Sequence, residues 1–449
     1  MEGSAIAGGS RPPSTDQKSE TPVARPTSDV NVDPRVDPRT DLGHSDESRG
    51  SFLSPYSALL RLPGAAAFYV AGGLGRYPRA TLSLGVVLLV SAESGSYATA
   101  GLVASMLVLL LAVSGPAWSA AMDRFGQARV LALSLIALIL TSTMLIVVVT
   151  VDAPRPLWFL SAALTGASAP DLGSAVRARW RALVDQKRVH TAFALESVAD
   201  ESAFVVAPPV VTLLAASVHP AAGLAVALLL GVVGAVILLV QTRTEPPRAP
   251  RRTRKRTLRD VLPPVEVLPV SFAFVAIGGL FGAFDVTAIG WAADVGVPVL
   301  GGTLIGILGL SMAIGSTVFG VLRFRISMRR RYLVAAALLG VLSVLLPATQ
   351  SGMLLLAASF VLGLVVGPMV VAGLALVEHR SPPARATEAL AYPSTGLGIG
   401  VTAGATLAGA MLDAEGPLQG YLVATAFGLA VVLLAVAGEG IRRWVGAIA

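Results

Sequence analysis

The sequence predicts an all-α membrane protein with twelve transmembrane helices, arranged as two six-helix halves related by pseudo-twofold symmetry. Hydrophobic residues make up 54% of the 449 residues and charged residues only 14%, and the mean hydropathy is +0.73. A soluble protein carries roughly a quarter charged residues, so this composition excludes an ordinary soluble domain. Apolar runs recur along most of the chain, and one basic segment near its midpoint divides them into two sets.

The first 55 residues differ in character from the rest. They are rich in Pro, Ser, Thr, Asp and Arg, and a Val-Asp-Pro-Arg repeat occupies 32–39. Such a segment buries too little apolar surface to offset its ordering entropy, so residues 1–55 are predicted to be a disordered cytoplasmic tail. The tail lacks the apolar region that marks a cleavable signal peptide.

Twelve apolar stretches follow, each long enough to cross a bilayer. A hydrocarbon core about 30 Å thick is crossed by about 20 helical residues, and the stretches show no two-residue alternation typical of membrane strands. The predicted spans are 64–90, 97–119, 130–152, 157–179, 192–217, 221–241, 267–290, 299–322, 332–349, 352–377, 387–411 and 419–439. They define six-helix halves at 56–241 and 264–449, joined by a basic cytoplasmic loop at 242–263.

The placement of Arg and Lys predicts the orientation, because cytoplasmic loops are enriched in both. With the N-terminus in the cytoplasm, Arg155 is the one basic residue on the outer loops. The chain is therefore predicted to be multi-pass in the bacterial inner membrane, with both termini cytoplasmic. The predicted inner segments carry Arg124, Arg129, Arg177, Arg179, Arg181, Lys187, Arg188, the basic residues of 243–259 and 323–331, Arg380, Arg385, Arg442 and Arg443.

The central loop contains five basic residues within 251–256. No aromatic residues interleave with them, so binding to nucleic acid is not predicted. Attraction to anionic lipids at the cytoplasmic face is the better interpretation, at about 1 kcal/mol per basic residue near that surface.

Several kinds of chemistry are not predicted. The chain has no cysteine, and its four histidines are scattered, so neither a metal site nor a cofactor is expected. No phosphate-binding Gly-rich motif is present that would couple the protein directly to ATP. The sequence gives no catalytic constellation, and the protein is not expected to be an enzyme.

The segment 122–129, MDRFGQAR, follows the second predicted span. It resembles the loop signature of the major facilitator superfamily (MFS), D-R-x-G-R-R preceded by a glycine four residues before the acid. Here Ser119 replaces that glycine, and Arg129 alone remains of the paired arginines. The resemblance implies a gating loop, in which an acid at a helix end beside arginines latches helices together. Its residues are Asp123, Arg124, Gly126 and Arg129.

Charged residues inside the spans are the main candidates for a functional site. A charge at mid-bilayer costs at least ~2.5–3.5 kcal/mol and is normally kept for a cavity or a partner. Arg76 and Arg79 are near neighbours on the first span, and Glu196 and Asp200 share one face of the fifth. The candidates for binding substrate or protons are Arg76, Arg79, Asp171, Glu196, Asp200, Glu201, Asp285 and Glu388.

The distribution of these charges agrees with the resemblance. The spans 130–152, 221–241, 332–349 and 419–439 carry no charge except at their ends. In the MFS these four helices face lipid, while the first, fourth, seventh and tenth line a central cavity and the others flank it. Two interpretations remain open: handling of substrate or protons, and structural ion pairs of Arg76 or Arg79 with Asp171 or Asp200.

Small residues recur every four positions at Gly396, Gly400, Gly404 and Ala408, which favours close helix packing. Together with the resemblance, the interior charges predict a monomeric secondary transporter of a small solute that works by alternating access. Proton-coupled efflux of an amphiphilic solute is the leading interpretation, because interior acids outnumber bases and some should titrate. Asp200 is the first candidate for the proton-coupling acid.

Two alternatives stay open. One is uptake of a metabolite whose anionic group is held by Arg76 and Arg79. The other is a non-transporting membrane scaffold or sensor that keeps the transporter fold.

Overall fold

The computed structural model describes residues 54–448 except 171, 248–266, 323–324, 349–350 and 382–385. The predicted disordered tail, apart from residues 54 and 55, and most of the predicted basic loop lie outside this described part. Within it, the regular elements are α-helices and one short 3₁₀ helix, η1 (Thr242–Thr244).

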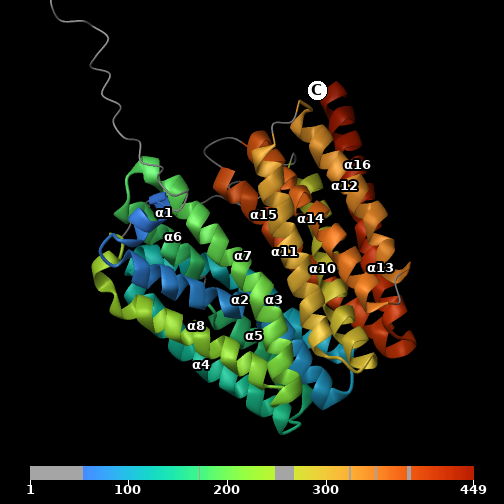
Figure 1. Cartoon of the computed structure of the whole chain (residues 1–449), viewed down its shortest axis with the longest axis horizontal. Coiled ribbons are helices and arrows are strands. Elements are labelled where there is room, and N and C mark those ends of the chain that lie inside the picture. Colours follow the sequence, from blue (N-terminus) through green and yellow to red (C-terminus); the bar gives the residue numbers. More distant parts are fainter. Residues whose placement is uncertain are drawn as a thin grey trace, which may run out of the picture. The chain divides into compact units, whose positions relative to one another are not determined.

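The helices form two groups, shown in Figure 1 in blue to green and in yellow to red. The N-terminal group contains α1 (Ser54–Leu60), α2 (Ala65–Ser94), α3 (Tyr97–Phe125), α4 (Gln127–Thr150), α5 (Arg155–Ser168), α6 (Leu172–Leu183), α7 (Gln186–Ser217) and α8 (Ala222–Val240). The C-terminal group contains α10 (Leu268–Asp294), α11 (Val299–Val321), α12 (Met328–Ser343), α13 (Leu345–Ala348), α14 (Gly352–Arg380), α15 (Ala386–Glu415) and α16 (Pro417–Ile448).

Ten helices of the described part are long and apolar enough to cross a membrane. They are α3, α4, α7, α8, α10, α11, α12 taken together with α13, α14, α15 and α16. The helix α2 and the pair α5 and α6 coincide with the first and fourth predicted spans. The observed helices thus match the twelve predicted spans in order.

The fourth span is interrupted, so the prediction of one continuous helix over 157–179 was wrong. Helix α5 ends at Ser168 and α6 begins at Leu172, with Ala169 in an extended conformation between them. Pro170 explains the break, because proline lacks the backbone donor and its ring disfavours the helical conformation of the preceding residue.

Helix boundaries follow local capping chemistry. The Ser96 side chain accepts a hydrogen bond from the Thr99 N–H and caps the start of α3. Gly95 ends α2 with φ +66°, and Gly126 separates α3 from α4 with φ +95°, a region that favours glycine. The tight connections between consecutive antiparallel helices are therefore encoded in the sequence.

The helices that the resemblance places against lipid carry exposed apolar side chains. Leu133 and Leu140 of α4 and Leu229 of α8 are exposed, as are Val341 of α12 and Leu433 of α16. In water such apolar surface would be unusual, whereas a lipid environment accepts it. These faces agree with the predicted arrangement.

The helix bundle has two ends, named after Asp413 and Arg179. At the Asp413 end, α2, α7, α10 and α15 finish and α3, α8, α11 and α16 begin. At the opposite end, named the Arg179 end, α2, α7, α10 and α15 begin and α6 finishes.

Candidate functional site

An ion-pair network joins α2 to α7 in the interior of the N-terminal group. The Arg76 guanidinium donates from Nη2 to Glu196 Oε2 and from Nε to Asp200 Oδ1, the latter at 2.6 Å. Glu196 is buried and also accepts a hydrogen bond from Trp180 Nε1 at 2.8 Å. Glu196 and Asp200 are one helical turn apart, so α7 presents both carboxylates to the same arginine.

Glycines in α2 make room for this network. A Cβ on Gly72 would lie 2.8 Å from both Arg76 Nη1 and a methyl group of Val176, and a Cβ on Gly75 would lie 2.4 Å from Leu172. Both glycines therefore allow α6 to pack closely on α2, which brings the broken fourth span next to Arg76.

Asp200 is the member of the network that faces open space. Its side chain is 29% exposed, against 1% for Glu196, and its second oxygen lies 3.5 Å from Arg177 Nη1 of α6. Two guanidinium groups from two helices therefore share one partly accessible carboxylate. Asp200 is therefore more accessible than the buried Glu196.

The ion pairs of this network do not include the other predicted site residues that the structure describes. Arg79 and Glu201 are exposed on α2 and α7, and Asp285 is half-buried on α10, in the other helix group. Asp171 lies outside the described residues, as does the side chain of Glu388. The structure thus joins Arg76, Glu196 and Asp200. The pair of Arg76 with Asp200 is one of the ion pairs predicted from the sequence, and Arg177 is an additional partner of Asp200.

The predicted gating loop lies at the Arg179 end, between α3 and α4. Asp123, Arg124 and Arg129 are exposed, and Asp123 has no ion pair within the part of the chain described. Gly126 supplies the positive φ that lets α4 begin directly after α3. Within the described ranges, no ion pair or side-chain hydrogen bond joins Asp123, Arg124 or Arg129 to the C-terminal group.

Arg179, predicted to lie in an inner loop, is instead fully buried in α6. Its Nε donates to Gln127 Oε1 at 2.9 Å, its Nη2 to the Leu238 carbonyl at 2.8 Å and its Nη1 to Thr244 Oγ1 at 2.8 Å. One side chain thereby ties α4, α6, α8 and η1 together. The only signal in the sequence was the glutamine at position 127, which stands where the family signature has an arginine.

A second buried cluster stabilises the C-terminal group at the same end. Glu439 of α16 accepts hydrogen bonds from Arg329 Nε of α12, at 2.6 Å, and from Arg380 Nη2 of α14. Arg329 and Arg380 were predicted to be loop charges, but here they neutralise a buried carboxylate. Sequence reasoning missed this site because Glu439 lies at the end of a span, where a charge looks solvated.

The two helix groups are held together at the Asp413 end. The Asp413 carboxylate accepts hydrogen bonds from Ser96 Oγ at 2.7 Å and from the N–H groups of Tyr97 at 2.8 Å and Ala98 at 2.9 Å. An acid of α15 therefore satisfies free donors in the first turn of α3, where the helix dipole also favours a negative charge. Further along these helices, Ser105 Oγ donates to the Thr402 carbonyl at 3.1 Å.

Glycines allow the helix backbones to meet across this boundary. A Cβ on Gly101 of α3 would lie 2.6 Å from the Ala405 carbonyl oxygen, and a Cβ on Gly409 of α15 would lie 2.5 Å from that of Tyr97. Helices α7 and α11 meet in the same way, since a Cβ on Gly302 would lie 2.4 Å from the Pro208 carbonyl oxygen.

The same helix faces separate toward the Arg179 end. On α7, Ser197 and Glu201 continue the face that contacts α11 at Pro208, and both are exposed. On α11, Gly320 continues the face of Gly302 and is exposed, with nothing within 4 Å of an added Cβ. Figure 1 shows α7 and α11 diverging in this direction. Among the described residues, the boundary between the two groups is closed at the Asp413 end, and these faces of α7 and α11 are exposed at the Arg179 end.

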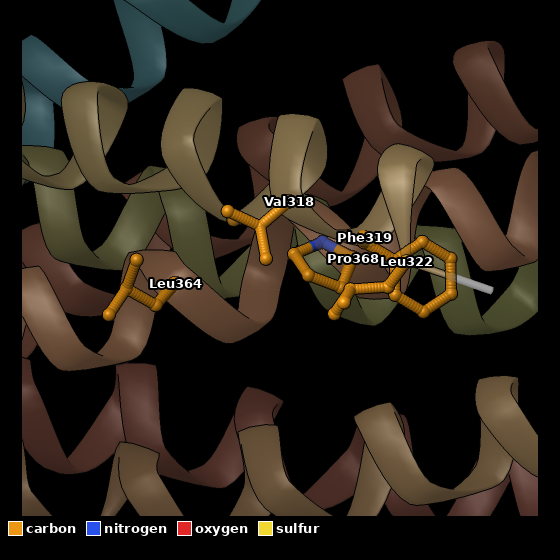
Figure 2. A pocket seen from close by; sticks show the side chains of 6 residues that line it. Val318, Phe319, Leu322, Leu364 and Pro368 are labelled. Carbon is orange, nitrogen blue, oxygen red and sulfur yellow. The ribbon is translucent and has the colours of Figure 1, made fainter. Parts of the chain in front are cut away.

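An apolar pocket of about 280 Å³ lies between α11 and α14 in the C-terminal group. Figure 2 shows its lining, which consists of Gly315, Val318, Phe319, Leu322, Leu364 and Pro368. The described lining of this pocket is apolar and suits an apolar group.

Comparison with known proteins agrees with the observed arrangement of helices. The profile of the Major Facilitator Superfamily matches residues 68–349 and 326–439. No curated protein matches the sequence. Solved structures of other transporters share the fold at low sequence identity, and at this identity their likeness shows the fold alone.

The transporter PepTSo of the POT family is 12% identical, with a TM-score of 0.63 over 84% of this chain and 97% of its own. The nucleoside transporter NupG is 14% identical, with a TM-score of 0.61 over 84% of this chain and 98% of its own. The human organic anion transporter MFSD10 is 17% identical, with a TM-score of 0.51 over 82% and 98%. The chain therefore belongs to the Major Facilitator Superfamily and is a multi-pass membrane protein with the fold of a secondary transporter.

Proposed function

We propose that this protein exports an amphiphilic solute across the bacterial inner membrane in exchange for protons. The observation that carries the proposal is the contrast between the two ends of the helix boundary. The same faces of α7 and α11 are in contact at the Asp413 end and exposed at the Arg179 end. Alternating access requires such a boundary, which can open at one end while it closes at the other.

The distribution of basic residues supports an orientation with the Arg179 end in the cytoplasm. Arg124, Arg129, Arg181 and Arg330 are exposed at that end, whereas Arg155 lies at the Asp413 end. By the positive-inside tendency, the conformation is then open to the cytoplasm, and both termini are cytoplasmic. An exporter would load its solute in this state.

Asp200 is the proposed proton-coupling acid. Its carboxylate is shared by Arg76 and Arg177, on helices that belong to two different spans. A carboxylate whose cationic partners change between two conformations binds a proton in one and releases it in the other. Protonation would also release Arg177, which links the proton to the packing of α6 on α7.

Uptake of an anionic metabolite has less support. That alternative needs Arg76 to grip the solute, but Glu196 and Asp200 already occupy two of its nitrogens and the side chain is only 3% exposed. An anion at Arg76 would compete with these two carboxylates.

The proposal is tested with purified protein in proteoliposomes that contain the pH indicator pyranine. Ethidium, chloramphenicol and taurocholate (a cation, a neutral molecule and an anion) are added one at a time. At least one of them should move protons through the wild type, and Asp200→Asn should abolish that movement. Solute flux without any proton movement would show a uniporter and overturn the coupling.

A further inference from the structure

Asp285 is an acid in the interior of the C-terminal helix group. It lies in α10, nine residues before the helix ends at Asp294. At 1.5 Å per residue, its backbone is about 13 Å from that end and farther from the other, so the carboxylate lies within the span. A charge at this depth is costly and is normally kept for a partner or for a ligand.

The helical positions place Asp285 on the face of α10 that is turned toward the N-terminal group. Gly282, three residues earlier, faces α15, since its added Cβ would lie 2.1 Å from the Val401 carbonyl oxygen. Ile289, four residues later, lies against Gly301 of α11. Val286 and Ile289 also belong to one hydrophobic cluster with residues of α2 and α3. Asp285 is therefore close to the level at which the two groups close.

Asp285 differs from Glu196 and Asp200 in having no basic partner among the described residues. Among the described residues, no hydrogen bond or ion pair involves Asp285, while Arg76 and Arg177 are engaged by Glu196 and Asp200. The side chain is half-buried within the helix bundle. The nearby surface is apolar, with Phe281 on the same side of α10 and the cluster of Val286 and Ile289 beside it.

We propose that Asp285 is the counter-charge for a positively charged group of the transported solute, which makes the cargo an amphiphilic organic cation. A single charged group among apolar side chains is the usual composition of a site for such a ligand. The bound cation would neutralise the carboxylate while the boundary at the Asp413 end is closed. This inference rests on the proposed transport function and adds the class of solute to it.

A proton carries the same single positive charge, so the test must separate the two. Tetraphenylphosphonium is a suitable probe because its charge is permanent and it has no proton to donate. Its binding to the purified full-length protein is measured at one fixed pH. The variant Asp285→Asn removes the charge with little change in shape, and Asp285→Glu keeps it. Asp294→Asn, at the exposed end of the same helix, is the matched control.

We expect the dissociation constant of the probe to rise at least tenfold in Asp285→Asn, to stay near the wild-type value in Asp285→Glu, and to be unchanged in Asp294→Asn. A thermal melt of each variant separates loss of the site from loss of the fold. Unaltered affinity in a folded Asp285→Asn, or no saturable binding to the wild type, overturns the inference. If the wild type does not bind the probe and Asp285→Asn alters proton coupling, Asp285 handles protons alone. Neither result would change the outcome of the pyranine assay with neutral and anionic solutes. The proposal of proton-coupled export is therefore judged separately.

Discussion

Asp413, near the end of α15, accepts a hydrogen bond from the Ser96 hydroxyl at the start of α3, at 2.7 Å, although 317 residues separate them in the sequence. The two residues belong to different helix groups, and this contact lies where the groups close. If transport requires this end to open, the contact must break in every cycle.

A disulfide at this contact should stop transport. The natural sequence has no cysteine, so Ser96→Cys with Asp413→Cys creates the only thiol pair in the protein. Oxidation should abolish solute flux in proteoliposomes, and dithiothreitol should restore it. Each single cysteine variant serves as the control. Wild-type flux in the oxidised pair would mean that this end does not open during transport.

Asp413→Asn should favour opening of the same end. The amide keeps one acceptor but loses the charge that interacts with the N-terminus of α3, and hydrogen bonds to a charged group are worth more than those to a neutral one. Because the site is exposed, we expect a modest change of about 1 kcal/mol or less. Spin labels at Ala194 and Thr317, exposed on α7 and α11, report it. The distance between these labels should shorten in the variant as the Arg179 end closes; an unchanged distribution would contradict the role given to Asp413.

Arg76→Ala should destabilise the fold far more than Arg330→Ala. The first change leaves Glu196 buried without its cation, and breaking a buried ion pair in this way costs about 3–5 kcal/mol. Arg330 is exposed, so its loss should lie within ~0.5 kcal/mol of neutral. Thermal unfolding in detergent measures both. Combining Arg76→Ala with Glu196→Gln should recover part of the loss, and equal stability of the two single variants would place Arg76 outside the network.

Asp200→Asn should abolish flux driven by a pH gradient and spare exchange of solute between the two sides. The substitution keeps the shape of the side chain but removes the group that binds the proton. Solute exchange without a gradient is the internal control for folding and binding. If the variant retains full gradient-driven flux, Asp200 has only a structural role.

Gly404→Ala should destabilise the C-terminal group, whereas Gly115→Ala should not. A Cβ on Gly404 would lie 1.9 Å from the Gly279 carbonyl oxygen of α10, while one on Gly115 meets nothing within 4 Å. Overpacking of this kind costs about 1–3 kcal/mol. Alanine at Gly115 should be neutral or slightly stabilising because it favours the helix. Melting temperatures of the two variants in detergent provide the comparison.

Much of the fold could be read from the sequence because the signals are local. A bilayer of fixed thickness requires apolar runs of a certain length, and those runs located the helices regardless of how they pack. The stripe of Gly396, Gly400 and Gly404 likewise predicted close packing, and each residue lies against a backbone carbonyl of α10. Pro170 was visible too, but its effect was underestimated, since the helix stops there.

The candidate site depended on contacts between distant segments. The sequence placed Arg76, Glu196 and Asp200 inside the membrane by their depth in apolar runs, because depth is a property of one helix. Which charges meet was decided by the packing of α2 on α6 and α7, which pairs Arg76 with both acids and adds Arg177 to Asp200. Arg179 and Asp413 are the clearest examples of residues whose partners the sequence could not predict. Each lies near a helix end, where a charge looks solvated, and only the tertiary structure brings the carbonyl groups of α8 to one and the free N–H groups of α3 to the other.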